Sequence, residues 1–325
     1  MSTEQPNTAR PDVPLISVVV PAHDEAGSVP VFHARTAAVL EKMGVTFEII
    51  YVNDGSRDGT LDEMLSLART DPRVRAIDLS RNFGKEIAMT AGIDAACGRA
   101  VIPIDIDLQD PPELIPDLVA KWREGYDVVY ATRQERGGEP LLRRATAGLF
   151  YRLMEKITAI TIPRDTGDFR LMSRPVVDAL HEIPERHRFM KGLFSWVGFR
   201  QVGITYRREP RCAGKTKWNY WKLWNFAIEG ITSFSHVPLQ AVTWFGFLVS
   251  VGAFLYALFI ILHTLFTGGD VPGYPSLITV ILFIGGVQLI ALGILGEYIG
   301  RIHDEVKSRP LYIVRAKHGF GSNDE

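Results

Sequence analysis

Three carboxylates and one amide fall within six consecutive positions, in the segment Asp105-Ile106-Asp107-Leu108-Gln109-Asp110. The segment follows residues 101–104, a short apolar run typical of a buried strand. If the chain stays extended, alternation places Asp105, Asp107 and Gln109 on one side, where all can face one ion. Oxygen ligands of this kind suit a hard divalent cation, Mg2+ or Mn2+, whose open positions a substrate diphosphate can fill. A solvated acidic turn is the alternative for an isolated motif.

Strand-like and helix-like runs alternate on both sides of these carboxylates. We expect strands at residues 15–20, 47–52, 74–79, 101–104 and 127–131, and helices at residues 29–43, 60–69, 85–97 and 113–124. This alternation predicts an α/β layer fold with a mostly parallel sheet. In such sheets, ligands bind at the carboxyl ends of the strands, close to the point where the strand order reverses.

Polar residues gather at the carboxyl ends of the first four expected strands. The clusters are Pro21-Ala22-His23-Asp24-Glu25, Asn53-Asp54-Gly55-Ser56, Arg81-Asn82-Phe83-Gly84-Lys85 and the segment that starts at Asp105. Each cluster alone is explained equally well as a turn or a helix cap. Because the clusters end successive strands, we expect them to converge on one crevice.

Two long apolar runs follow, at residues 242–265 and 277–295. Each is long enough to cross a bilayer as a helix, which takes about 20 residues. Two buried core helices are the alternative. The joining loop has no Lys or Arg, whereas basic residues flank the pair at Lys215, Lys217, Lys222, Arg301, Lys307 and Arg309. The positive-inside rule therefore predicts a multi-pass protein with both termini and the large N-terminal portion in the cytoplasm.

Basic and aromatic residues mix in the segments 141–160 and 218–234. We interpret both as interfacial helices that lie on the bilayer surface, with core packing of the aromatic residues as the alternative. The formal net charge of −1 gives no reason to expect a nucleic acid partner. The two cysteines have neither metal-ligand nor disulfide-scaffold spacing.

Several motifs together carry a resemblance to a known family. They are VVVPAHDE, YVNDGSRDGT, LSRNFGKE, DIDLQDPPE, DTGDFRLMSR and GEYIGRIHDEVKSRPLYIV. The chain resembles family-2 glycosyltransferases with a GT-A fold, in the polyprenyl-phosphate branch that includes dolichol-phosphate mannose synthases and two-helix bactoprenol glucosyltransferases. The composition and the resemblance together predict a disordered lead-in at 1–14, a cytoplasmic catalytic domain at 15–212, a juxtamembrane amphipathic helix at 213–236, a membrane hairpin at 237–299 and a cytoplasmic tail at 300–325.

The resemblance also implies roles for individual residues. Pro21 and Glu25 would line the nucleotide pocket, Asp54 would contact the base, and Lys85 would approach the donor. Asp105, Asp107 and Gln109 would surround the metal ion and the diphosphate, with Asp107 essential to catalysis. Asp168 would be the catalytic carboxylate at the acceptor, either as a base or as an orienting group. The acceptor phosphate would meet Arg133, Lys191, Lys215 and Lys217. Lys191 departs from the pattern, because Arg is more usual there and Lys lacks its bidentate fork.

The implied activity is inverting transfer of a monosaccharide, with UDP-glucose the expected donor, onto undecaprenyl or another polyprenyl phosphate at the bacterial inner membrane. Use of GDP-mannose is the nearest alternative. A processive polysaccharide synthase is disfavoured, because no Gln-x-x-Arg-Trp segment occurs. A non-catalytic nucleotide-sugar-binding scaffold and a channel subunit are alternatives of other classes. The glycines Gly285, Gly286, Gly293 and Gly296 permit close helix contacts, which leaves a homo-oligomer open.

Overall fold

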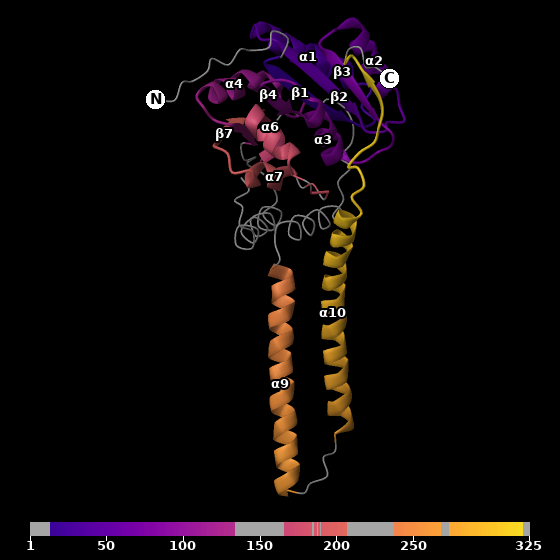
Figure 1. Ribbon diagram of the computed structural model, residues 1–325, viewed down its shortest axis with the longest axis vertical. Helices are drawn as coiled ribbons and strands as arrows, with labels where there is room; N and C mark the ends of the chain where they lie inside the picture. The colour runs from indigo at the N-terminus through magenta and orange to yellow at the C-terminus, as the bar shows by residue number, and fades with distance from the viewer. Residues whose placement is uncertain are drawn as a thin grey trace, which may run out of the picture.

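The computed structural model describes residues 14–133, 166–183, 185, 186, 188, 190–206, 237–267 and 273–320. Within them one mixed sheet forms the centre of an α/β domain, as predicted (Figure 1). Its strand order is β7-β5-β6-β4-β1-β2-β3-β8. The strands are β1 (Ile16–Ala22), β2 (Phe47–Asn53), β3 (Val74–Leu79), β4 (Ala100–Pro103), β5 (Val128–Arg133), β6 (Thr166–Ser173), β7 (Gln201–Tyr206) and β8 (Val314–His318).

The pairing is mostly parallel in the half of the sheet that the sequence predicted. Strand β1 pairs in parallel with β2 and with β4, and β2 pairs in parallel with β3. Strand β6 was not predicted; it runs antiparallel between β4 and β5. Strand β8 was also not predicted, and it pairs antiparallel with β3 at the edge of the sheet.

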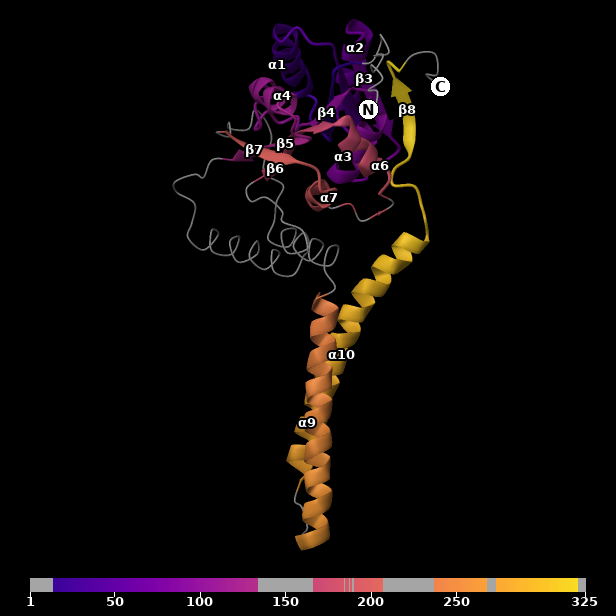
Figure 2. The ribbon, with the colours of Figure 1, turned by 60° about the vertical axis from the view of Figure 1, so that its left-hand side comes forward.

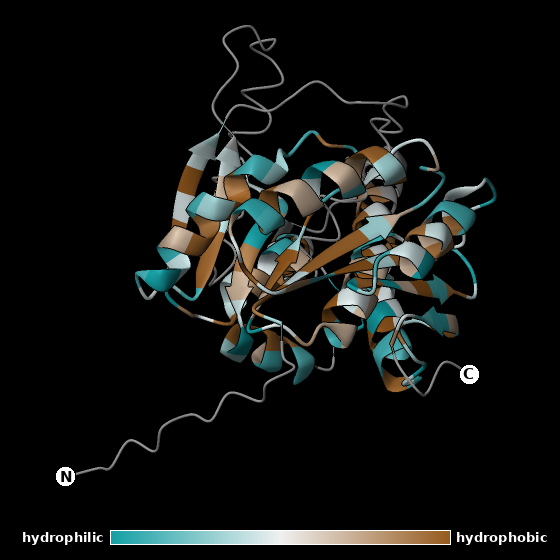
Figure 3. Ribbon diagram, turned by 90° about the horizontal axis from the view of Figure 1, so that it is seen from above, coloured by the Kyte–Doolittle hydropathy of each residue, from teal (hydrophilic) through white to brown (hydrophobic). Residues whose placement is uncertain are grey.

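Helices cover both faces of the sheet. They are α1 (Val29–Lys42), α2 (Thr60–Thr70), α3 (Lys85–Ala95), α4 (Ile115–Arg123), which follows the short turn η1 (Pro112–Leu114), α6 (Arg174–His181) and α7 (Met190–Trp196). Alternation along the strands divides the core in two. Val18 packs in the cluster that contains Phe32 of α1, and the neighbouring Val19 packs in the cluster that contains Met89 of α3. Seen from above, the strands are hydrophobic and many exposed helix faces are hydrophilic (Figure 3).

Two long helices extend away from this domain side by side (Figures 1 and 2). They are α9 (Val237–Thr267) and α10 (Tyr274–Val306). Both are long and apolar enough to cross a membrane, over Val242–His263 and Thr279–Val306, and neither stretch is buried inside the protein. Phe254 and Leu265 are 69% and 76% exposed. Apolar side chains displayed on this scale indicate a membrane or partner surface. Helix α10 continues to Val306, beyond residue 299 where the membrane hairpin is expected to end.

Some expectations fall on residues that the structure does not describe. These are most of the lead-in at 1–14, the interfacial segments 141–160 and 218–234, and Lys215 and Lys217. They remain predictions.

Candidate active site

Lys85 joins two carboxylates that come from different strands. It is the first residue of α3, whereas Asp105 follows β4 and Asp168 lies in β6. Its Nζ lies 2.7 Å from Asp105 Oδ1 and 2.5 Å from Asp168 Oδ2. The side chain of Asp168 is only 9% exposed, while that of Lys85 is 44% exposed. The expectation that the strand-end clusters converge therefore holds for Lys85 and Asp105, and Asp168 joins them from β6. The three residues form a charged cluster open to solvent on the lysine side.

The environment shifts the pKa of each group in the cluster. Burial opposes the charge on Lys85, but Asp105 and Asp168 outweigh it and raise the pKa of the lysine well above its usual value. Burial raises the pKa of Asp105, and Lys85 offsets part of that effect. For Asp168, burial works in the same direction, but the charges of Lys85 and Lys191 prevail and hold its pKa below the ordinary range. Asp168 is therefore a stable carboxylate at neutral pH.

Asp168 also has an unused acceptor. Its Oδ1 is buried and has no hydrogen-bond partner among the described residues. A buried carboxylate oxygen without a donor is costly unless a ligand or an ion satisfies it. This pattern is typical of a functional site rather than of a structural ion pair.

Arg170 follows Asp168 by two positions on the same buried strand, and the sequence analysis assigned it no role. Its guanidinium donates to the carbonyl oxygen of Gly167 at 3.0 Å and lies 3.9 Å from the centre of the Phe194 ring. Burial lowers the pKa of Arg170 to about 10. The only available signal was its place in the motif DTGDFRLMSR.

The segment after β4 does not have the extended geometry expected of it. The strand ends at Pro103, the chain turns at residues 106 and 107, and Leu108 adopts a positive φ of 57°. Alternation therefore does not place Asp105, Asp107 and Gln109 on one side; that expectation is wrong because the chain turns. Instead Asp107 Oδ1 accepts a hydrogen bond from the backbone N–H of Gln109 at 3.1 Å.

The carboxylates of this segment do not form a complete metal site by themselves, because among the described residues no group of three or more His, Cys, Asp or Glu side chains is arranged to hold an ion. Mg2+ and Mn2+ sites on nucleotide substrates commonly use one or two carboxylates and complete their shell with phosphate oxygens and water. Asp105 and Asp107 would supply that number of hard oxygen ligands, and Lys85 contacts both oxygens of Asp105 in this structure.

Asp54, at the end of β2, holds the loop that leads to Lys85. Its Oδ1 accepts the backbone N–H of Phe83 at 2.7 Å, and its Oδ2 accepts that of Gly84 at 3.0 Å. Gly84 has a φ of 95°, which favours glycine, and α3 starts at the next residue. Asp54 therefore fixes the loop that leads to Lys85, and both of its carboxylate oxygens accept hydrogen bonds from that loop.

The loops after β1 and β2 are fastened to each other. The backbone N–H of Asp24 donates to Ser56 Oγ at 3.1 Å. Glu25 Oε2 accepts the hydroxyl of Ser28, three residues further along the chain, at 2.8 Å. Pro21 lies within buried strand β1. Of the expected nucleotide-pocket residues, Glu25 thus lies on one of two loops that are hydrogen-bonded to each other, and Pro21 lies in the strand that leads into it.

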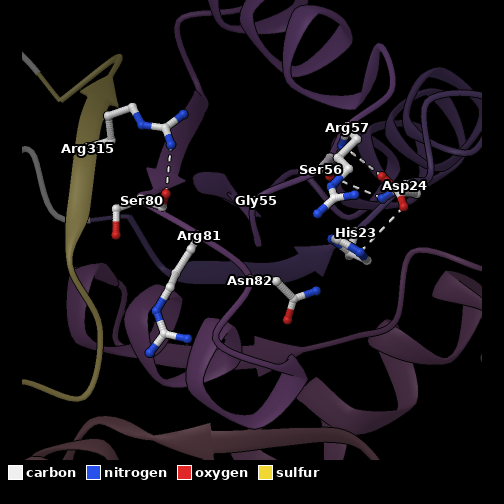
Figure 4. A pocket seen from close by; sticks show the side chains of 9 residues that line it. All are labelled: His23, Asp24, Gly55, Ser56, Arg57, Ser80, Arg81, Asn82 and Arg315. Carbon is white, nitrogen blue, oxygen red and sulfur yellow. Dashed lines mark hydrogen bonds and ion pairs between the residues drawn. The ribbon is translucent and has the colours of Figure 1, made fainter.

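A cavity of about 410 Å³ opens between these loops and the loop after β3. Its lining residues are His23, Asp24, Gly55, Ser56, Arg57, Ser80, Arg81, Asn82 and Arg315 (Figure 4). Gly55 is required here, because a Cβ atom would lie 2.5 Å from the backbone of Arg81. The cavity does not include Lys85, which lies three residues beyond Asn82 on the same loop. Arg315, from β8, was missed by the sequence analysis.

The remaining predicted site residues lie apart from this cavity. Lys191 is in α7, and its charge acts on Asp168. Arg133 ends β5, where it is paired in register with Tyr206 of β7. The hydroxyl of Tyr206 in turn donates a hydrogen bond to the buried Asp110, a contact that was not predicted from the sequence.

Comparison with known proteins adds a family to this geometry. Residues 17–180 match glycosyl transferase family 2, and residues 238–302 match the GtrB C-terminal hairpin. The chain is 50% identical over 303 residues to the SfII prophage-derived bactoprenol glucosyl transferase of Shigella flexneri, covering 93% of this chain and 98% of that protein. It is 49% identical over 300 residues to the prophage bactoprenol glucosyl transferase homolog of Escherichia coli, covering 92% and 98%.

Solved structures of other proteins also resemble part of the chain. Mannosyl-3-phosphoglycerate synthase from Rubrobacter xylanophilus has a TM-score of 0.48 at 19% identity, covering 66% of this chain and 71% of that one.

Proposed function

Because this chain belongs to glycosyl transferase family 2 and has the GT-A fold, we propose that it transfers glucose from UDP-glucose to undecaprenyl phosphate or a related polyprenyl phosphate. The observation that carries the proposal is the cluster of Lys85, Asp105 and Asp168 at the carboxyl end of the sheet. The relatives named as bactoprenol glucosyl transferases match over nearly the whole chain, including the hairpin, which supports a lipid-linked acceptor.

The donor nucleotide would lie over the loops after β1, β2 and β3. Pro21 lies near the end of β1, Glu25 belongs to the loop that follows, and Asp54 fixes the loop after β3 by holding two of its N–H groups. The diphosphate would extend from there toward Asp105, Asp107 and Gln109, beside Lys85. A divalent ion bound to these carboxylates would neutralise the departing diphosphate as a Lewis acid. Lys85 adds a fixed positive charge on the same side, and such oriented charges commonly supply the largest catalytic term.

The acceptor would enter from the side of Asp168. A phosphate is already anionic at neutral pH, so the reaction needs less base catalysis than transfer to a sugar hydroxyl. Asp168 stays ionised, and its free Oδ1 can orient the acceptor or take up a proton. The acceptor phosphate would be held by Lys191, whose charge already acts on this site, with Arg133, Lys215 and Lys217 as further cations. Attack from the face opposite the leaving group inverts the anomeric carbon.

The two apolar helices support a reaction at a membrane surface. We infer that α9 and α10 span the bacterial inner membrane, with both termini and the domain at 15–212 in the cytoplasm. Basic residues flank the pair and the joining loop carries none, which supports this orientation. Segments 141–160 and 213–236 would rest on the lipid surface, and the tail at 300–325 would return to the cytoplasmic domain. The glycines of α10 leave a homo-oligomer as part of the same proposal.

The direct test offers several donors to one acceptor. Purified full-length protein in liposomes with undecaprenyl phosphate and Mn2+ is incubated separately with radiolabelled UDP-glucose, UDP-galactose, UDP-N-acetylglucosamine and GDP-mannose. We expect label in the extracted lipid from UDP-glucose. If label enters the lipid only from GDP-mannose, the donor is GDP-mannose rather than UDP-glucose. Binding of nucleotide sugars without transfer from any of them would favour the non-catalytic scaffold and overturn the proposal.

A further inference from the structure

The chain returns from the membrane hairpin to the sheet. After α10 ends at Val306, β8 joins the edge of the sheet beside β3 (Figures 1 and 2). Three contacts fasten the connection. Glu305 Oε1 accepts the backbone N–H of Arg186 at 2.8 Å, and the hydroxyl of Tyr312 donates to Asp94 at 2.9 Å. The carbonyl oxygen of Ile313 accepts the N–H of Ser80 at 2.9 Å.

A bulge in β8 gives Arg315 its direction. Leu79 is paired with Val314 and Asp78 with Ala316, so Arg315 is an extra residue with no partner in the register. Bulges of this kind re-aim a side chain and are common beside active sites. Here the guanidinium donates through Nη2 to the carbonyl oxygen of Ser80 at 2.7 Å, and its Nη1 lies 3.3 Å from Asp78 Oδ2. Figure 4 shows Arg315 reaching from β8 to Ser80 at the cavity wall.

Asp78 connects Arg315 to the loop after β2, which lines the cavity. Its Oδ1 accepts the side-chain amide of Asn53 at 2.7 Å, and Asn53 Oδ1 accepts the N–H of Ser56 at 3.2 Å. Both Asp78 and Asn53 are 2% exposed. A buried carboxylate needs a cationic partner or several donors, and Arg315 supplies the positive charge. One continuous set of hydrogen bonds therefore links β8 to Ser56, which lines the cavity.

The same contact bears on the charged cluster. Ser80 is the first residue of the loop after β3. This loop carries Arg81 and Asn82 along the cavity, its Phe83 and Gly84 N–H groups donate to Asp54, and it leads to Lys85. A guanidinium that holds the carbonyl oxygen of Ser80 fixes the start of this loop. Asp54 fixes its end.

We infer that β8 is part of the donor site and that Arg315 is a positioning residue, which holds the walls of the nucleotide pocket in the arrangement that binds the donor. This role rests on the proposed nucleotide-sugar donor. Arg315 acts through Ser80 and Asp78. Because linkage is reciprocal, nucleotide that binds better to the docked arrangement also tightens the docking of β8. The membrane hairpin is thereby connected to donor binding through its own C-terminal strand.

The test compares two basic residues on the same strand. Arg315→Ala removes the fork, Arg315→Lys keeps the charge, and Lys317→Ala is the matched control, because Lys317 contacts Phe320 rather than the cavity. Binding of UDP with Mn2+ is measured by calorimetry, and KM and kcat are measured with UDP-glucose. We expect Arg315→Ala to raise both the Kd for UDP and the KM about tenfold, with kcat changed by less than about threefold. Arg315→Lys should fall between, and Lys317→Ala should match the wild type.

Hydrogen exchange supplies a readout that does not depend on activity. UDP should slow exchange at the N–H of Ser80 and in β8 in the wild type and in Lys317→Ala, and should do so less in Arg315→Ala. If Arg315→Ala binds UDP as the control does, or loses kcat with KM unchanged, the inference is overturned while the proposed function stands. If the wild type binds neither UDP nor GDP, the donor assignment itself fails and the inference fails with it.

Discussion

Replacing Lys85 by methionine removes the ammonium group that Asp105 and Asp168 share. Breaking a buried ion pair by deleting one partner destabilises a protein by about 3–5 kcal/mol. The side chain of Lys85 is 44% exposed and that of Asp105 is 28% exposed, so solvent screening reduces the expected loss to about 2–3 kcal/mol. Because about 1 kcal/mol corresponds to roughly 2–4 °C in a domain of this size, Tm should fall by about 4–12 °C.

The same substitution should alter the remaining carboxylates and abolish sugar transfer. Without Lys85, burial and the neighbouring Asp105 raise the pKa of Asp168, since the lysine is the main ionic cause that lowers it. Adding Asp168→Asn removes the repulsion, so the double variant Lys85→Met/Asp168→Asn should regain about 1–2 kcal/mol relative to the sum of the single changes. It should remain inactive, because neither charge is restored.

Thermal unfolding of the full chain in detergent, together with the lipid-transfer assay, measures both effects. Lys121→Met is the matched control, because Lys121 forms an exposed ion pair with Glu124 within one helical turn. Such pairs contribute little, so Tm and transfer should not change in the control. An unchanged Tm and full transfer in Lys85→Met would refute the reasoning, since the three charges would then not form one functional cluster.

Three further predictions follow from the same geometry. Asp107→Ala should reduce transfer at least about a hundredfold, an effect on the scale of lost electrostatic stabilisation, while its Tm stays within a few degrees of the wild type; full transfer would contradict the ligand assignment. Asp168→Asn should lower kcat much more than it raises the KM for UDP-glucose, and a change confined to KM would remove it from the acceptor side. Burial lowers the pKa of His33 below 6.5, so the unfolded chain takes up this proton at higher pH than the folded one. The stability that neutral His33 contributes is present above pH 6.5 and is lost on acidification. As the pH is lowered, Tm should fall less in His33→Asn than in the wild type; an equal fall in both proteins would contradict this role of His33.

The strands predicted from the sequence are those whose apolar runs are buried on both faces. Strands β1, β2 and β3 are rich in Val, Ile and other apolar residues, and their bounds agree with the predicted ones to within two residues. Strand β6 was missed because Asp168 and Arg170 interrupt its apolar pattern, although all eight of its residues are buried. The charged residues of β6 belong to the candidate site, and because they are charged, the strand cannot be recognised from its hydrophobicity pattern.

Distance along the chain explains the rest of what was missed. Lys85 meets Asp168 across 83 positions, and Arg315 meets Ser80 across 235. The motifs indicated that Lys85 and Asp168 share a site, because the resemblance to family-2 glycosyltransferases, now confirmed, brought them together. Nothing local indicated that the short, charged β8 pairs with β3. The turn at residues 106 and 107 was missed because alternation assumes a strand that in fact ends at Pro103.

A metal ion held by the carboxylates and the lysine-carboxylate cluster should together promote transfer of glucose to a lipid phosphate. The measurement that tests it is the rate at which label from UDP-glucose enters undecaprenyl phosphate in liposomes that contain the purified protein. It is taken with EDTA and again after Mn2+ is restored in excess. We predict that EDTA stops the transfer and that Mn2+ restores it in the wild type but not in Asp107→Ala. Undiminished transfer in EDTA would contradict the claim.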